Sequence, residues 1–326
     1  MGLYSHRPRR FLYWTIIFSI VLLWLICVLL IAGKAKPQAT NSLSKNKLRQ
    51  NNRKEDTHLL PTIPTKEIAP NVYMPVISIG AGGTQKRRAY EIVDNWLKQG
   101  GVGIDTALAY KNQPDIASVI KKDKDRRNNV FVTTKIPDCD TSKTKDYIQQ
   151  SLNELETNYI DLVLIHAPRR GNCVETWKVL ENYHEQETIR AIGVSNFRKE
   201  DLKPILQQGK IIPAVNQIWL NMGHIDTETV SFSEQHGITI QAFRPLERGD
   251  KASDKQMVVQ HPTVRSIATQ HNVTPYQIAL QWILQHGWIL AFQSVSKEHQ
   301  QQNVDLTSLR LTPHEMEELD KISKST

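Results

Sequence analysis

From about residue 72 onward, short runs of β-branched residues alternate with amphipathic segments at a spacing of roughly 30 residues, a pattern typical of repeated βα units around a parallel sheet. Eight runs are predicted to be strands, at 76–79, 102–107, 130–134, 160–165, 191–194, 214–218, 238–243 and 289–292. Helices are predicted at 87–98, 114–122, 142–155, 174–187, 199–207, 227–236, 263–271, 275–286 and 298–306. Eight strands that are each followed by a helix favour a closed (β/α)8 TIM barrel, which usually takes about 250 residues.

An open doubly wound sheet is the alternative arrangement of the same elements. It would normally place a GxGxxG turn directly after its first strand. The turn that follows the first predicted strand here, Gly80-Ala-Gly-Gly-Thr84, lacks that spacing. The α/β pattern therefore favours the closed barrel.

The N-terminal region has a different character from the barrel. Residues 11–33 form an apolar run that only Thr15 and Ser19 interrupt, and a basic flank, residues 1–10, precedes it. At a rise of about 1.5 Å per residue, a helix of this length crosses a hydrocarbon core of about 30 Å. We therefore predict a single-pass transmembrane anchor that places the protein at a lipid bilayer. A cleaved signal peptide is the alternative, although its apolar core usually spans only about 7 to 15 residues.

Basic residues on both sides of the apolar run leave the orientation in the membrane open, and the type of membrane is open as well. Residues 34–60 are polar, without a hydrophobic period, and are predicted to be a flexible tether. The predicted order is thus a basic flank, an anchor at 11–33, a tether at 34–60 and the barrel at 61–326.

The net charge of +8 does not belong to the barrel. Residues 1–54 hold ten lysines and arginines and no acidic residue, which leaves 31 basic and 33 acidic residues in the rest of the chain. This distribution argues against a nucleic-acid partner. The three cysteines, at positions 27, 139 and 173, have no CxxC spacing, so we expect thiols rather than a disulfide scaffold, and no structural metal site.

Four different titratable residues lie at or just after predicted strand ends. Asp105, Lys135 and His166 end three successive strands, and Tyr110 follows Asp105 on the adjoining loop. Each alone has a structural explanation: a loop cap, a solvated lysine or a packed histidine. In a closed barrel, however, the carboxyl ends of all strands meet at one face, so these side chains should share a pocket.

Proton donation is the chemistry that these four side chains suggest. A tyrosine has an ordinary pKa of about 10, and a nearby cation favours its ionised form, so we expect Lys135 to lower the pKa of Tyr110. Asp105 would pair with Lys135, and His166 would hydrogen-bond and orient a carbonyl oxygen.

Several motifs in this order resemble the successive signatures of the aldo-keto reductases, over roughly residues 71–322. The motifs are Gly103-Ile-Asp-Thr-Ala-Leu-Ala-Tyr110, Thr134-Lys135, Leu164-Ile-His166, Ile192-Gly-Val-Ser-Asn-Phe197 and Val215-Asn-Gln217. The resemblance implies a barrel, expected to be monomeric, that binds an extended nicotinamide cofactor without a Rossmann fold. It also implies reduction of a small-molecule aldehyde or ketone to an alcohol.

The resemblance assigns roles to individual residues. Tyr110 would be the general acid, and Asp105, Lys135 and His166 would complete the catalytic tetrad. Ser195, Asn196 and Gln217 match the residues that hold the nicotinamide carboxamide, and Phe243 matches an aromatic residue stacked on the nicotinamide ring. Arg244 stands where serine is common, and we expect it either to meet the pyrophosphate or to be a surface charge.

The segment at 292–303 departs from the family pattern. Ser294 and Asn303 match it, but Gln293 replaces the usual lysine, His299 the usual arginine and Gln302 the usual glutamate. The basic residues would normally meet the 2'-phosphate of NADP through charge-assisted hydrogen bonds. NADP(H) is the cofactor expected from the resemblance, and NAD(H) use stays open. A catalytically weak or inactive barrel that acts as a nicotinamide-binding regulatory or scaffold protein is the alternative.

Two features concern the substrate side. The loop after His166 is short, and the chain ends soon after Asp320 without a long tail. We therefore expect an open carbonyl site with a broad substrate range.

Overall fold

The computed structural model describes residues 63–83, 86–122, 125–246 and 258–323. The predicted anchor at 11–33 and the predicted tether at 34–60 lie outside these residues. Within the described stretches, no helix combines the length and the apolar character needed to cross a bilayer.

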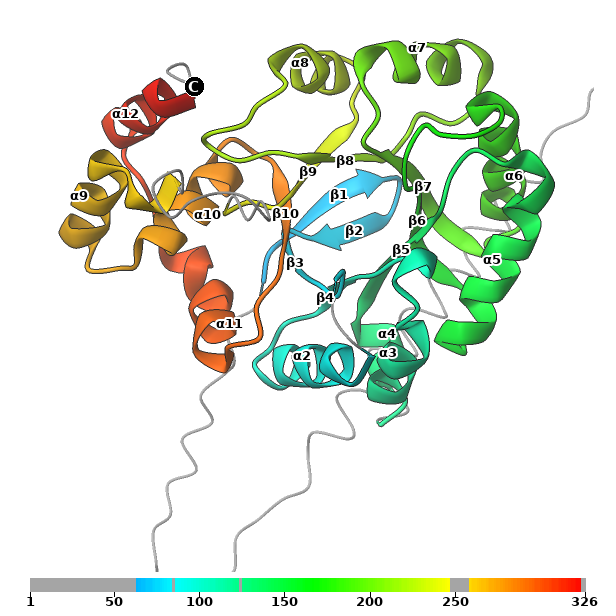
Figure 1. The fold of residues 1–326 in the computed structure, drawn as a ribbon, viewed down its shortest axis with the longest axis horizontal. Coiled ribbons are helices and arrows are strands. Elements are labelled where there is room, and N and C mark those ends of the chain that lie inside the picture. The colour runs from blue at the N-terminus through cyan, green and yellow to red at the C-terminus, as the bar shows by residue number, and fades with distance from the viewer. Residues whose placement is uncertain (1–62, 84–85, 123–124, 247–257, 324–326) are drawn as a thin grey trace, which may run out of the picture. The chain divides into compact units, whose positions relative to one another are not determined.

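Eight parallel strands close into a barrel in which β10 pairs with both β9 and β3, so the predicted barrel is confirmed (Figure 1). The strands are β3 (Ile77–Gly80), β4 (Gly103–Asp105), β5 (Phe131–Ile136), β6 (Ile160–Ile165), β7 (Ile189–Ser195), β8 (Val215–Trp219), β9 (Thr239–Phe243) and β10 (Ile289–Phe292). Every residue of β5 and β6 is buried, as expected for strands covered on both faces. β4 is shorter than predicted because the chain leaves the sheet after Asp105 and turns into the 3-10 helix η1 (Leu108–Tyr110).

Helices surround the barrel in an outer ring (Figure 1). They are α2 (Lys86–Lys98), α3 (Gln113–Ile120), α4 (Arg126–Asn129), α5 (Thr141–Leu155), α6 (Cys173–Glu185), α7 (Lys199–Gln208), α8 (Thr227–Gln235), α9 (Pro262–His271), α10 (Pro275–Gln285), α11 (Lys297–Val304) and α12 (Pro313–Ser323). Three tryptophans, Trp96, Trp177 and Trp282, belong to the core between these helices and the strands. α10 begins where its capping chemistry requires, because the Thr274 side chain accepts from the Gln277 backbone and Pro275 occupies the first turn.

A two-stranded antiparallel hairpin, β1 (Thr65–Ala69) and β2 (Val72–Pro75), precedes the barrel and was not predicted. In Figure 1 it lies across the barrel opening. Its buried residues Ile68 and Met74 pack against the inward-facing residues Phe131, Val215 and Ile289, each the first residue of its strand. The hairpin therefore covers the N-terminal end of the barrel, opposite the face where the strands end.

Candidate active site

The strand ends bring the four predicted catalytic residues together. Asp105 is the last residue of β4, Lys135 lies near the end of β5, His166 follows β6 and Tyr110 ends η1. The loop that carries Tyr110 is fixed by Asn112, whose side chain accepts a hydrogen bond from Thr106 Oγ1 (2.8 Å) and donates one to the Ala81 carbonyl (2.8 Å). Asn112 is fully buried, so these bonds form inside the protein and hold the loop in place.

Lys135 and Asp105 form a buried ion pair. Lys135 Nζ donates to Asp105 Oδ1 at 2.6 Å and to the Thr106 carbonyl at 2.9 Å. The Lys135 and Asp105 side chains are 1% and 6% exposed. Burial by itself would lower the pKa of Lys135, but its interactions with Asp105 and Tyr110 outweigh burial, and the pKa lies above its ordinary value. Lys135 is therefore a permanent cation at neutral pH.

Tyr110 lies between Lys135 and His166. Lys135 Nζ is 5.4 Å from the centre of the Tyr110 ring, and the His166 ring meets it edge-on with centres 5.6 Å apart. Burial raises the pKa of Tyr110 more than Lys135 lowers it, so the pKa lies above its ordinary value. The expected lowering was wrong, because it weighed the cation without the loss of water around the phenol. The Tyr110 hydroxyl is protonated at neutral pH.

Gly82 explains how the Tyr110 ring fits beside the strand-end loop. A Cβ atom at position 82 would lie 3.0 Å from Tyr110 Cζ and 3.2 Å from its hydroxyl oxygen. A larger residue would displace the ring, so the glycine in the turn after β3 serves close approach rather than the phosphate contact of a dinucleotide fold.

His166 is neutral in the folded protein. Burial, followed by the positive charge of Lys135, lowers the pKa of His166 from 6.5 to about 4. The Asn196 side chain donates to the His166 carbonyl at 2.9 Å, which ties the end of β6 to the end of β7. A neutral imidazole carries one N–H, which can donate to an acceptor in the pocket.

The depressed pKa of His166 makes the stability of the fold depend on pH. As pH falls from 6.5 towards 4, the unfolded chain gains a proton at this position and the folded chain does not, so the free energy of unfolding decreases. Across that whole window the contribution is about 3 kcal/mol. Between pH 7 and pH 4.5, we expect the free energy of unfolding to decrease by about 2 kcal/mol less in His166→Gln than in the wild type. Urea unfolding at the two pH values measures this difference.

The control for this measurement is His236→Gln, since His236 is an exposed residue at the C-terminal end of α8. This control should follow the wild-type pH dependence. Equal pH dependence of His166→Gln and wild type would contradict the assignment of a buried neutral histidine.

A chain of buried amides continues from the ion pair across the barrel. Gln217 Nε2 donates to Asp105 Oδ2 and to Gln241 Oε1, both at 2.7 Å. Gln241 is fully buried and was not predicted as a site residue. A glutamine that points into the barrel could have indicated a site residue in the sequence. Burying its amide costs free energy unless the amide is hydrogen-bonded, and an apolar residue could fill the same space without that cost.

Ser195 ends β7 and lies beside Gln217, the middle residue of β8, and Asn196 follows Ser195. The Asn196 backbone N–H donates to the Gln217 carbonyl at 2.9 Å, and Asn196 Nδ2 donates to Ser195 Oγ at 3.0 Å. Asn196 has a φ of 60°, a conformation that asparagine adopts more readily than most residues. The three residues predicted to share one ligand group are therefore adjacent in space.

Phe243 ends β9, and Arg244 follows it with a φ of 51°. The Arg244 guanidinium lies 5.7 Å from the centre of the Trp219 ring, and Trp219 in turn stacks on His224 with ring centres 4.1 Å apart. Arg244 is exposed. Its stacking fixes the side chain at the rim of the barrel beside Phe243.

The altered segment follows β10. Gln293 donates its side-chain N–H to the Gly82 carbonyl, and His299 stacks on Tyr276 with ring centres 6.1 Å apart. Ser294 Oγ donates to the Ser296 carbonyl at 3.3 Å, and Asn303 is buried on α11. Gln293 and His299 are both exposed, so both can meet a ligand along the outside of this strand end.

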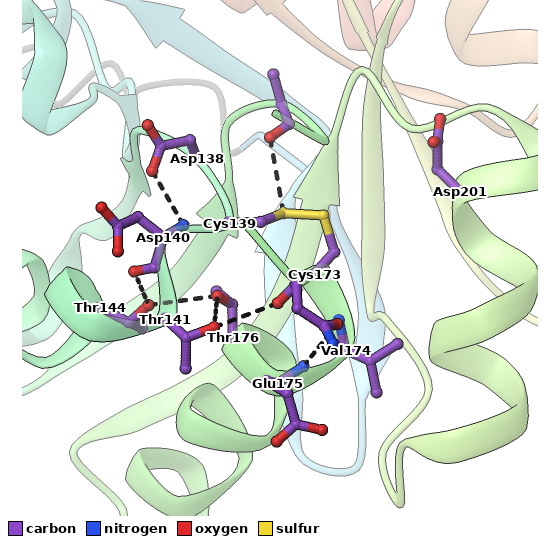
Figure 2. The surroundings of a disulfide bond; sticks show 12 residues. Asp138, Cys139, Asp140, Thr141, Thr144, Cys173, Val174, Glu175, Thr176 and Asp201 are labelled. Carbon is purple, nitrogen blue, oxygen red and sulfur yellow. Dashed lines mark hydrogen bonds between the residues drawn. A yellow bond between two sulfur atoms is a disulfide. The ribbon is translucent and has the colours of Figure 1, made fainter. Parts of the chain in front are cut away.

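The expectation of unpaired cysteines was wrong for two of the three positions. Cys139 and Cys173 form a disulfide between the loop after β5 and the start of α6 (Figure 2). The residues are 34 positions apart, so no short sequence spacing signals the pairing, which depends on the two strands being neighbours in the barrel. Cys27 lies outside the described residues.

A pocket of about 510 Å³ opens between the loops that follow β6 and β7, and none of the four predicted catalytic residues lines it. One wall is the loop after β6 and the other is the loop after β7. The residues that line it are Ala167, Pro168, Arg169, Asn196, Arg198, Glu200 and Asp201. Asn196 is the member of this lining that also contacts Ser195 and His166.

Comparison with known proteins agrees with this geometry. A model of the aldo/keto reductase family matches residues 76–324. The chain is 33% identical to 9,11-endoperoxide prostaglandin H2 reductase of Trypanosoma cruzi, over 78% of this chain and 89% of that protein. It is 31% identical to glyoxal reductase of Bacillus subtilis, over 80% of this chain and 93% of that protein.

A solved structure of an aldo/keto reductase from Brucella melitensis is similar to the barrel. It superposes with a TM-score of 0.75 at 29% identity, covering 80% of this chain and 100% of that chain. The family match extends over most of the chain and includes every barrel strand. The protein therefore belongs to the aldo/keto reductase family, oxidoreductases that reduce carbonyl compounds with a nicotinamide cofactor, typically NADPH.

Proposed function

We propose that this chain reduces an aldehyde or ketone to an alcohol, with Tyr110 as the general acid. The observation that carries the proposal is the buried Lys135–Asp105 pair beside a protonated Tyr110. The Tyr110 hydroxyl donates its proton to the carbonyl oxygen, and the neutral His166 donates a hydrogen bond to the same oxygen. A bound nicotinamide supplies the hydride for the carbonyl carbon.

Lys135 is central because burial makes Tyr110 a weaker acid. A general acid works best when its pKa is near the working pH, and burial moves the pKa of Tyr110 away from it. The positive charge of Lys135 opposes that effect and stabilises the phenolate that remains after proton transfer. Asp105 keeps Lys135 in position through the 2.6 Å bond.

A carboxamide would find hydrogen-bond partners at Ser195, Asn196 and Gln217, in the polar atoms that are not already used within the protein. Both N–H groups of the Asn196 amide and both of the Gln217 amide already donate to protein atoms. The carbonyl oxygens of these two side chains can accept from a carboxamide NH2, and the Ser195 hydroxyl can donate to its oxygen. Phe243 at the end of β9 supplies an aromatic face for the nicotinamide ring.

We propose NADP(H) as the cofactor, with weaker discrimination against NAD(H) than a lysine and an arginine would give. Gln293→Lys combined with His299→Arg should raise the preference for NADPH over NADH about 10- to 100-fold, because hydrogen bonds to charged groups contribute about 1.5 to 3 kcal/mol. The measurement is the ratio of the two Kd values by cofactor fluorescence.

Gln293→Glu is the matched opposite change for the cofactor experiment. A carboxylate at this position should repel a 2'-phosphate and lower the NADPH preference. Equal Kd ratios in the wild type and in both variants would show that this segment does not meet the phosphate.

We propose small aldehydes and dicarbonyls as substrates. The loop between β6 and α6, which includes His166, is short. Relatives named glyoxal reductase and methylglyoxal reductase act on small dicarbonyls by their names. The residues at 11–33 are proposed to anchor this activity to a lipid bilayer through the tether at 34–60, on the strength of their length and apolar composition.

The deciding experiment is a reductase assay of the full chain in detergent. Methylglyoxal is supplied with NADPH or with NADH, and loss of the reduced-nicotinamide absorbance is followed. Turnover with either cofactor supports the proposal. Tight cofactor binding without oxidation would favour the alternative of a nicotinamide-binding regulatory or scaffold barrel.

A further inference from the structure

The Cys139–Cys173 disulfide connects two loops that both begin at site residues. Cys139 lies four residues after Lys135, and Cys173 lies seven residues after His166. Figure 2 shows the bond bridging the loop after β5 and the start of α6. The cross-link therefore lies at the strand-end face of the barrel, close to the chemistry proposed above.

The two loops also make noncovalent contacts, which include an isolated β-bridge between Cys139 and Gly171 and a hydrogen bond from Thr141 Oγ1 to the Asn172 carbonyl at 3.4 Å. The Cys139 backbone N–H donates to the Arg169 carbonyl at 2.8 Å, and Arg170 pairs with Asp138 at 3.7 Å through a side chain that is 81% exposed. An exposed ion pair of this kind contributes little to stability. Gly171, with a φ of 77°, lies so close that an added Cβ would be 2.3 Å from the Cys139 carbonyl oxygen. The loops are thus packed backbone to backbone, with the disulfide as their covalent connection.

The cross-linked loop directly follows His166, the residue proposed to hold the carbonyl oxygen, and it forms one wall of the neighbouring pocket. Ala167, Pro168 and Arg169 line this pocket, and the Arg169 carbonyl is the acceptor for the Cys139 N–H. Cys139 Sγ itself lies 4.0 Å from the Ala167 carbonyl oxygen. The disulfide therefore contributes, together with this backbone hydrogen bond, to the position of the segment that follows His166. The Lys135–Asp105–Gln217 bonds, by contrast, are made at the ends of the barrel strands.

The two sulfurs differ in their surroundings. Cys139 is fully buried, whereas Cys173 is partly exposed at the first position of the 13-residue helix α6. This setting makes Cys173 the sulfur that an external thiol can reach.

We propose that Cys139 and Cys173 are positioning residues for the carbonyl side of the site, and that reduction of their disulfide weakens carbonyl binding while cofactor binding is kept. This inference rests on the proposed function. A dithiol is the reductant: one of its thiolates attacks the Cys173 sulfur, the S–S bond breaks and the Cys139 sulfur takes a proton. The second thiol then closes the disulfide of the reductant and releases the Cys173 thiol, so two electrons pass to the protein.

The test uses the full chain with Cys27→Ser, so that Cys139 and Cys173 are its two cysteines. Thiols are counted before and after treatment with excess dithiothreitol, and kcat and KM for methylglyoxal, the NADPH Kd and amide hydrogen exchange are measured in both states. Reduction should raise KM about three- to tenfold with kcat changed less than about twofold, which is the pattern of lost binding. Exchange should become faster at 167–172, and the NADPH Kd should stay the same.

The matched control carries Cys139→Ala and Cys173→Ala as well as Cys27→Ser. It should show the kinetics of the reduced protein and should not respond to dithiothreitol. Two thiols in protein purified without reductant would overturn the proposal. So would an unchanged KM after complete reduction, or an equal effect of dithiothreitol on the alanine variant.

A general stabilising role would look different from a positioning role. If reduction lowers Tm and abolishes NADPH binding together with turnover, the disulfide supports the fold as a whole and the positioning role is wrong. If the oxidised protein reduces no carbonyl, the proposed function fails, but amide hydrogen exchange still tests whether the disulfide holds the loop after His166. Faster exchange confined to 167–172 after reduction supports this role, and unchanged exchange overturns it.

Discussion

Replacing Tyr110 by phenylalanine is expected to lower kcat for carbonyl reduction about 10²- to 10⁴-fold, the usual contribution of a positioned general acid. The ring and its contacts with Lys135 and His166 are kept, and the proton is removed. The NADPH Kd should therefore change less than twofold. Single-turnover kinetics and cofactor fluorescence on the same sample measure the two quantities.

Tyr147→Phe is the control for this loss, since Tyr147 lies in the middle of α5 and packs against the core. It should keep wild-type kcat. In the wild type, reduction should stay constant through neutral pH and decline only above the ordinary tyrosine pKa of 10.0, because burial raises the pKa of Tyr110. Full activity of Tyr110→Phe would remove the central role assigned to the phenol.

Replacing Lys135 by methionine is expected to abolish turnover and to lower the free energy of unfolding by about 3 to 5 kcal/mol, because it leaves a buried carboxylate without its cation. The Lys135 pKa is raised in the folded protein, so the stabilisation from its charge is fully present below 10.5 and is lost as pH rises through the folded-state value. At neutral pH the variant therefore shows the whole loss. Urea unfolding measures it.

The double variant Asp105→Asn/Lys135→Met tests how much of the expected loss comes from leaving one charge buried without its partner. An asparagine can still accept the Gln217 hydrogen bond, and no charge is left buried. The double variant should be more stable than Lys135→Met alone while remaining inactive. Losses that simply add would show that the two side chains do not stabilise each other.

The barrel strands were predictable because each is a short β-branched run buried on both faces. The run at 160–165, for example, coincides with β6. The hairpin at β1 and β2 was not predicted because its strands have only five and four residues and Pro64, Pro70 and Pro75 lie at their ends. In these strands only Ile68, Met74 and Pro75 are buried, so no alternating pattern marks them. Its role depends on which barrel residues lie beneath it, and this is a tertiary property.

In the site, too, some features could be predicted from the sequence and others could not. Asp105, Lys135, His166 and Tyr110 could be found because strand ends converge in a barrel, whatever lies between them in sequence. The direction of the Tyr110 pKa shift could not be found, since it depends on burial around the phenol. The Cys139–Cys173 pairing and the inward position of Gln241 likewise depend on neighbouring strands and side chains that sequence spacing does not reveal.

The hairpin also bears on how far the chain can be shortened from its N-terminal side. The family match begins at residue 76, directly after β2. A truncation at that boundary would remove Ile68 and Met74 and leave the first barrel layer, including Phe131 and Ile289, in water. Burying two such side chains contributes about 3 to 6 kcal/mol, a large part of the stability of an ordinary domain. Shortened forms of the protein should therefore begin ahead of Thr65.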